Sequence, residues 1–135
     1  MIRTTMIGLA AAAVVLTGSP AFATPPAPGD ADGGQGPGAE LTLTYMAEAG
    51  FATAVKLDCY PPGGGHPQPA QACAELAAVG GNPDRIKPRH SMCMMIYAPV
   101  TAQIAGNWLG TTLVWQHQYG NSCEMHRALG VLFDF

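Results

Sequence analysis

The sequence predicts an α+β domain built on an antiparallel β-sheet. Apolar and polar residues alternate at 41–45 and again at 51–57, which is typical of two half-buried strands joined by a turn near Gly50. An alanine-rich run at 70–79 has apolar residues at helical spacing instead. Strands and helices that follow each other without a regular βαβ alternation favour the α+β class.

The first 23 residues have the parts of a secretory signal peptide. Arg3 supplies the positive charge, residues 6–16 are a short apolar run, and Ala21-Phe22-Ala23 is a cleavage motif of small residues. An apolar run of about eleven residues is too short to cross a bilayer, which needs roughly twenty. We therefore expect export with cleavage after Ala23, and a secreted, extracellular protein without a membrane anchor.

Residues 24–40 are expected to form a flexible arm before the domain. They contain four prolines and five glycines and have no aromatic or large aliphatic side chain, so they cannot bury enough surface to order themselves. The compact domain is expected at 41–135. Its two strands are followed by a proline- and glycine-rich loop at 61–67 and by the helix at 70–79, which Gly80-Gly81 ends.

The second half of the domain predicts a hairpin, a helix and a last strand. Asn82-Pro83 starts a brief helical turn, and the polar run 87–91 is exposed. Gly106-Asn107 predicts a two-residue turn between strands at 100–105 and 108–119. Asn121 with Glu124 is a capping box for a helix that ends at Gly130, and alternation at positions 131, 133 and 135 predicts a terminal strand.

Charge and motifs exclude several function classes. The chain has 6 basic and 9 acidic residues, and the basic ones are scattered, so we expect neither nucleic-acid binding nor a polybasic membrane contact. The sequence has no Gly-x-Ser-x-Gly, His-Glu-x-x-His or phosphate-binding glycine motif, and its carboxylates are not paired. We therefore expect a protein that is not an enzyme and has no cofactor.

The four cysteines, Cys59, Cys73, Cys93 and Cys123, predict two disulfides, because exported proteins oxidise their thiols. A structural zinc site would favour a close pair such as Cys-x-x-Cys, which this chain lacks, so no metal site is expected. Four cysteines can pair in three ways, and the spacing alone does not choose among them.

The segment 92–99 places five large apolar side chains around Cys93 and is bracketed by Pro88 and Pro99. One interpretation is a buried strand in which methionine fills gaps. A second is a copper site in a small exported binding protein, in which Cys93 would be a free thiol beside His90 and the thioethers. A third is an extended loop that a serine protease with a hydrophobic S1 pocket would accept. The missing period-two alternation and the flanking prolines favour a loop.

Five blocks, together with the cysteine spacing, resemble the Streptomyces subtilisin inhibitor family: LTLT at 41–44, AELAAVGG at 74–81, MCMMIYAP at 92–99, GNW at 106–108 and NSCEM at 121–125. The resemblance covers about 40–135. It implies a five-stranded antiparallel sheet with two short helices, disulfides Cys59–Cys73 and Cys93–Cys123, and a homodimer. It also implies tight, reversible inhibition of subtilisin-like serine proteases.

The resemblance further implies a reactive-site bond between Met95 and Ile96, which makes Met95 the P1 residue. The flanking protease contacts would be Met92, Cys93, Met94 and Tyr97, and we expect Asn121 to support the loop by a side-chain hydrogen bond. An unbranched apolar P1 residue suits subtilisin-like and chymotrypsin-like pockets and offers trypsin no cation. The chain departs from the family at Met94, where proline is frequent, and at Ala98, where an acidic residue is common. Its first inter-cysteine loop is also about one residue shorter.

Overall fold

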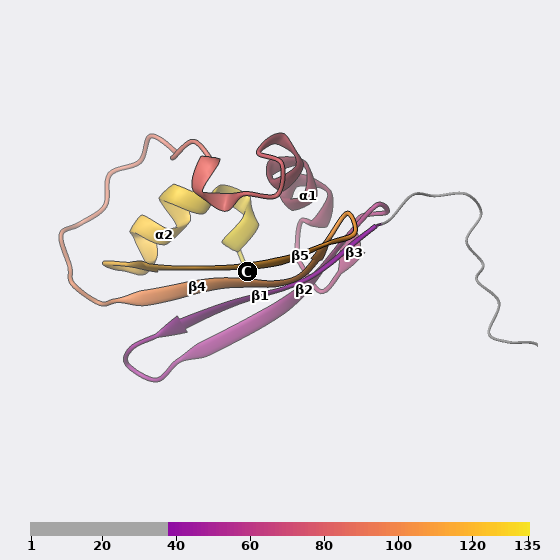
Figure 1. Cartoon of the computed structure of the whole chain (residues 1–135). Coiled ribbons are helices and arrows are strands. Elements are labelled where there is room, and N and C mark those ends of the chain that lie inside the picture. The colour runs from indigo at the N-terminus through magenta and orange to yellow at the C-terminus, as the bar shows by residue number, and fades with distance from the viewer. Residues whose placement is uncertain (1–37) are drawn as a thin grey trace, which may run out of the picture. The chain divides into compact units, whose positions relative to one another are not determined.

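A computed structural model describes residues 38–135, which form a five-stranded antiparallel sheet with helices over one face (Figure 1). The strand order is β3-β2-β1-β4-β5. The elements are β1 (Ala39–Ala47), β2 (Ala52–Cys59), β3 (Gly63–Gly64), α1 (Pro69–Ala78), η1 (Pro83–Arg85), β4 (Val100–Trp108), β5 (Thr111–Tyr119), α2 (Ser122–Leu129) and η2 (Gly130–Phe133). The predicted signal peptide and most of the predicted arm lie outside the described residues. Within 38–135, no helix is both long and apolar enough to span a bilayer.

The core lies between the sheet and the helices. Alternation in the strands directs one set of side chains to the helical layer and the other set to the opposite, exposed face. α2 contributes Met125 and Leu129, and α1 contributes Leu76. The fully buried large side chains are Leu43, Leu57, Leu76, Ile104, Met125, Leu129, Leu132 and Phe133. The α+β class, the five strands and the two helices are therefore confirmed.

Most of the predicted elements are found close to their predicted positions. β1 begins at the buried Ala39, two residues before the expected start of the domain, because Ala39 pairs with both Cys59 and Trp108. The predicted loop at 61–67 contains the short strand β3, which adds an edge to β2. α1, η1 and α2 match the helices expected from the sequence. Asn121 caps α2, since its Oδ1 accepts a hydrogen bond from the Glu124 N–H at 2.9 Å.

The prediction of a turn at Gly106-Asn107 is wrong. β4 continues through both residues, and the two-residue turn is Leu109-Gly110, where both φ angles are positive (50° and 86°). The side chain of Asn107 instead supports this turn by accepting a hydrogen bond from the Gly110 N–H at 2.9 Å. Trp108 explains the shift, because its ring is buried against Gly81, where a Cβ atom would lie 2.6 Å from it. A turn before Trp108 would shift this residue relative to the neighbouring strand β1 and move its ring away from Gly81.

The predicted strand at the C-terminus is also wrong. Gly130, with a φ of 57°, ends α2, and the chain continues as the 3-10 helix η2. Val131, Leu132 and Phe133 are consecutive and all buried, whereas a half-exposed strand would bury only alternate residues. The buried His66 also accounts for this turn, because its Nε2 lies 3.2 Å from the Leu132 carbonyl oxygen while its Nδ1 accepts from the Gln68 N–H.

Candidate functional site

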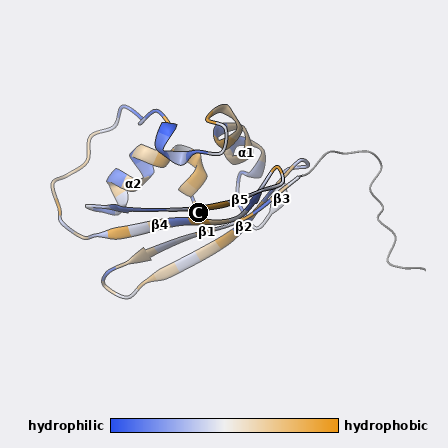
Figure 2. Cartoon of the chain, in the orientation of Figure 1, coloured by the Kyte–Doolittle hydropathy of each residue, from blue (hydrophilic) through white to orange (hydrophobic). Residues whose placement is uncertain are grey.

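The segment 91–99 forms a long loop without regular secondary structure that arcs away from the sheet before β4 begins (Figure 1). In Figure 2 the hydrophilic stretch before the arc gives way to paler, more hydrophobic colours along it. Met95 is fully exposed at 103%, Met92 is at 98%, and Met94, Ile96 and Tyr97 are exposed as well. A buried strand is therefore excluded, and the loop exposes five large apolar side chains to solvent.

Backbone hydrogen bonds hold the loop at both ends. Before it, the Arg89 N–H donates to the Arg127 carbonyl at 2.8 Å. After it, the buried Pro99 accepts from the Glu48 N–H at 3.0 Å, which ties the loop to the β1–β2 turn. The exposed side chains between these anchors consequently belong to a segment whose backbone is fixed to the domain on two sides.

The centre of the loop is fixed by a turn and by Asn121. The Ile96 N–H donates to the Met94 carbonyl at 2.8 Å, a three-residue turn that has Met95 at its apex. The Nδ2 of Asn121, itself buried, donates to the Ile96 carbonyl at 2.8 Å and lies 3.5 Å from that of Met94. Because Asn121 Oδ1 is already held by the helix cap, its amide nitrogen is oriented toward the loop.

Disulfides join Cys59 to Cys73 and Cys93 to Cys123, as the family resemblance implies. The second one links the loop to the first turn of α2, at a sequence separation of 30. The copper hypothesis requires a free Cys93 thiol, and this bond removes it. The described residues contain no free cysteine and no group of three His, Cys, Asp or Glu side chains arranged for a metal.

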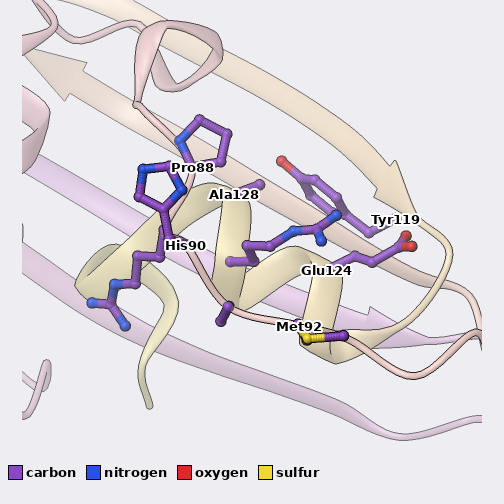
Figure 3. Close-up of a pocket in the computed structure, with 9 residues that line it drawn as sticks. Pro88, His90, Met92, Tyr119, Glu124 and Ala128 are labelled. Atoms are coloured by element: carbon purple, nitrogen blue, oxygen red, sulfur yellow. The ribbon is translucent and has the colours of Figure 1, made fainter.

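A hollow of about 830 Å³ lies behind the first part of the loop, between residues 88–92 and α2. Figure 3 shows Pro88 and His90 at one end of it and Tyr119 beside Glu124 at the other, with Met92 near the rim. Burial and, to a smaller extent, the negative charge of Asp84 raise the pKa of Tyr119 to about 12. The Tyr119 hydroxyl is protonated near neutral pH, as a tyrosine with the ordinary pKa would also be, so it adds no charge to this hollow.

The structure gathers the residues singled out from the sequence in one place, because Met92, Met94, Met95, Ile96 and Tyr97 share the loop that Cys123 and Asn121 contact. Sequence reasoning missed Gly120, whose carbonyl accepts the Ala98 N–H at 2.8 Å. It also missed Glu48 and Arg127. The expected side-chain hydrogen bond from Asn121 to the loop is present. The sequence carries no comparable signal for Gly120, Glu48 and Arg127, because the capping pattern at Asn121 and Glu124 indicates only where a helix starts.

Sequence comparison links the chain to protease inhibitors. The family described as "Subtilisin inhibitor-like" matches residues 38–121. A subtilisin inhibitor of Streptomyces albogriseolus is 36% identical over 116 residues, which cover 81% of each chain. A Streptomyces longisporus protein named as a trypsin inhibitor is 38% identical over 94 residues, covering 68% of this chain and 65% of that one. A Streptomyces avermitilis protein named as a serine protease inhibitor is 46% identical, but the match spans only 52% of its length.

A solved structure has the same fold. It is that of sermetstatin from Streptomyces caespitosus in complex with subtilisin from Bacillus licheniformis, with a TM-score of 0.64 and 28% identity. The match covers 73% of this chain and 99% of that one. By family match over most of the described residues, and by fold, this chain belongs to the subtilisin inhibitor-like family, which consists of protease inhibitors and not of enzymes.

Proposed function

We propose that this protein inhibits subtilisin-like serine proteases by presenting the loop 91–99 as a substrate, with Met95–Ile96 as the reactive-site bond. The observation that carries the proposal is the combination of full exposure and fixed backbone at Met95, which is 103% exposed at the apex of a turn. A protease needs an accessible side chain for its S1 pocket and an extended backbone on either side of it. Met92, Cys93, Met94 and Tyr97 would provide the flanking contacts.

A fixed loop explains how a substrate-like segment can inhibit. A flexible peptide loses chain and side-chain freedom on binding, whereas this loop has lost much of it already through the Cys93–Cys123 disulfide and the Asn121 hydrogen bonds. More of the contact energy therefore appears as affinity. If the protease cleaves the bond, the new amino group of Ile96 stays held beside the acyl group, so religation competes with hydrolysis.

The direct test is titration of subtilisin with the protein in its disulfide-bonded form. We expect loss of protease activity to be linear and to end at one inhibitor chain per enzyme. Chymotrypsin should also be inhibited, because its S1 pocket accepts a large apolar side chain, while trypsin should be affected little. Full subtilisin activity at micromolar inhibitor would refute the proposal. Mass spectrometry of a long incubation then identifies the bond that the enzyme cuts, which we expect to be Met95–Ile96.

We propose secretion on the basis of residues 1–23, and a homodimer on the basis of the exposed face of the sheet. Among the described residues, nothing covers this face over β1, β4 and β5, and Val114 is 77% exposed there. Glu40 lies at the start of β1 on this face, but the side chains at the centre of the face are uncharged, which suits packing against a second copy. They are Thr42, Thr44, Thr101, Gln103, Ala105, Val114 and Gln116.

Val114→Arg is expected to convert the dimer to a monomer, because it places a charge in the proposed interface without a partner. Sedimentation at micromolar concentration measures the change. Gln71→Arg, which adds the same charge on the exposed surface of α1, should stay dimeric. A wild-type protein that sediments as a monomer would contradict the proposed dimer and leave the inhibitory loop unaffected.

A further inference from the structure

Gly120 and Asn121 form the surface on which the loop rests, and together they contact alternate loop residues. Asn121 Nδ2 faces the carbonyls of Met94 and Ile96, and the Gly120 carbonyl accepts the Ala98 N–H at 2.8 Å. Because the backbone groups of residues 94, 96 and 98 turn toward the domain, the side chain of Met95 between them is free to point outward. The position of the Gly120 peptide therefore bears directly on the conformation of the loop after Met95.

Glu124 in the first turn of α2 holds this surface in two ways. Its backbone N–H donates to Asn121 Oδ1 at 2.9 Å, which is the helix cap, and its carboxylate Oε2 accepts from the Gly120 N–H at 3.1 Å. In a regular capping box the carboxylate would bond the N–H of the cap residue itself, which is Asn121. Here it reaches one residue further back, to the residue whose carbonyl holds Ala98.

Gly120 is required for this approach of the carboxylate. A Cβ atom at position 120 would lie 2.8 Å from Glu124 Oε2, so any larger residue displaces the carboxylate. The φ angle of Gly120 is not positive, so an alanine fits the backbone and disturbs only this contact. The charged acceptor makes a stronger hydrogen bond than a neutral one would. Figure 3 places Glu124 at this end of α2, next to Tyr119, the last residue of β5.

We propose that Glu124 is a positioning residue for the reactive-site loop and acts through the Gly120 peptide on Ala98. The effect on inhibition rests on the proposed function, whereas the positioning itself is argued from the chain of contacts Glu124–Gly120–Ala98. The hydrogen bond of the Glu124 carboxylate goes to Gly120, which lies outside the loop. It restrains Gly120, and Gly120 restrains the segment that follows the reactive-site bond, which must stay in place for religation.

Three variants test the proposal, with two measurements on each. Glu124→Ala removes the acceptor, Gly120→Ala displaces it, and Glu124→Gln restores an acceptor without the charge; the helix cap at Asn121 remains in all three. Glu40→Ala, which removes the same charge from the exposed face of β1, is the control. The first measurement is hydrogen exchange of the Ala98 amide, and the second is the rate at which subtilisin hydrolyses Met95–Ile96 in the complex.

We expect Glu124→Ala and Gly120→Ala to raise both rates about tenfold, the effect of losing one charge-assisted hydrogen bond. Glu124→Gln should fall between wild type and Glu124→Ala, because a neutral acceptor makes the weaker bond, and Glu40→Ala should remain close to wild type. Unchanged exchange of Ala98 in Glu124→Ala, or a Glu124→Gln variant that behaves like Glu124→Ala, would overturn the proposal. If the wild-type protein fails to inhibit subtilisin, the proposed function falls, while exchange of the Ala98 amide still decides whether Glu124 positions the loop.

Discussion

Replacing Met95 by lysine is expected to redirect inhibition from subtilisin-like enzymes to trypsin. The S1 pocket of trypsin carries a carboxylate, for which methionine provides no cation and lysine does. Because the side chain at position 95 is fully exposed, the substitution should leave the fold unchanged. We expect inhibition of trypsin to strengthen at least about 100-fold, since a buried charge without its partner is strongly rejected. Inhibition constants against subtilisin, chymotrypsin and trypsin measure the change.

Met92→Lys is the matched control for this experiment. Met92 is as exposed as Met95 and lies in the same loop, so lysine adds the same charge three residues before the proposed P1 position. It should produce little trypsin inhibition. If Met95→Lys leaves the profile unchanged, or if Met92→Lys has the same effect, Met95 is not the P1 residue.

Removing the Cys93–Cys123 disulfide is expected to turn the inhibitor into a substrate. With both cysteines replaced by serine, the loop keeps its hydrogen bonds to Asn121 and Gly120 but loses its covalent link to α2. We expect subtilisin to cleave Met95–Ile96 in this variant about 10 to 100 times faster, because the segment before the bond is no longer held in place for religation. Recovery of subtilisin activity with time, followed alongside the mass of the cleaved chain, measures the effect.

The other disulfide provides the control, because the two bonds stabilise the fold to a similar extent. Their sequence separations of 14 and 30 residues correspond to about 3 and 3.7 kcal/mol of loop entropy in the unfolded chain. Replacing Cys59 and Cys73 by serine should therefore lower the free energy of unfolding about as much as removing Cys93–Cys123. Below the melting temperature, however, this variant should keep subtilisin inhibited over time. Equal acceleration of cleavage in both variants would show that loss of stability, and not loss of the loop clamp, is responsible.

Local patterns were sufficient to predict much of the fold. The alternation at 41–45 and 51–57 predicts β1 and β2 because one face of each strand is buried and the other is exposed, which is a property of neighbouring residues. Asn121 and Glu124 predict the start of α2 because a helix cap spans only three residues. The segment 92–99 could be predicted to be an exposed loop and not a buried strand, because it lacks period-two alternation and has flanking prolines, which are again features of neighbouring residues.

The errors arose where a local pattern competed with burial. Gly106-Asn107 is a good turn dipeptide, but the ring of Trp108 has to reach Gly81, so β4 continues and the turn forms at Leu109-Gly110. Residues 131, 133 and 135 alternate like a strand, yet Leu132 between them is as buried as its neighbours and η2 results. In both cases the position of a large apolar side chain in the core outweighed the preference of the backbone.

The sequence by itself determined the fold class, the family and which segment carries the exposed methionines, because these depend on composition, spacing and short-range pattern. The tertiary structure decided how that segment is held. The bonds from Asn121 to Ile96, from Ala98 to Gly120 and from Glu124 to Gly120 join groups that the turn after β5 brings beside the loop. Asn121 and Ile96 are 25 positions apart, so no local pattern encodes their contact. It exists only because the sheet brings the start of β4 beside the end of β5.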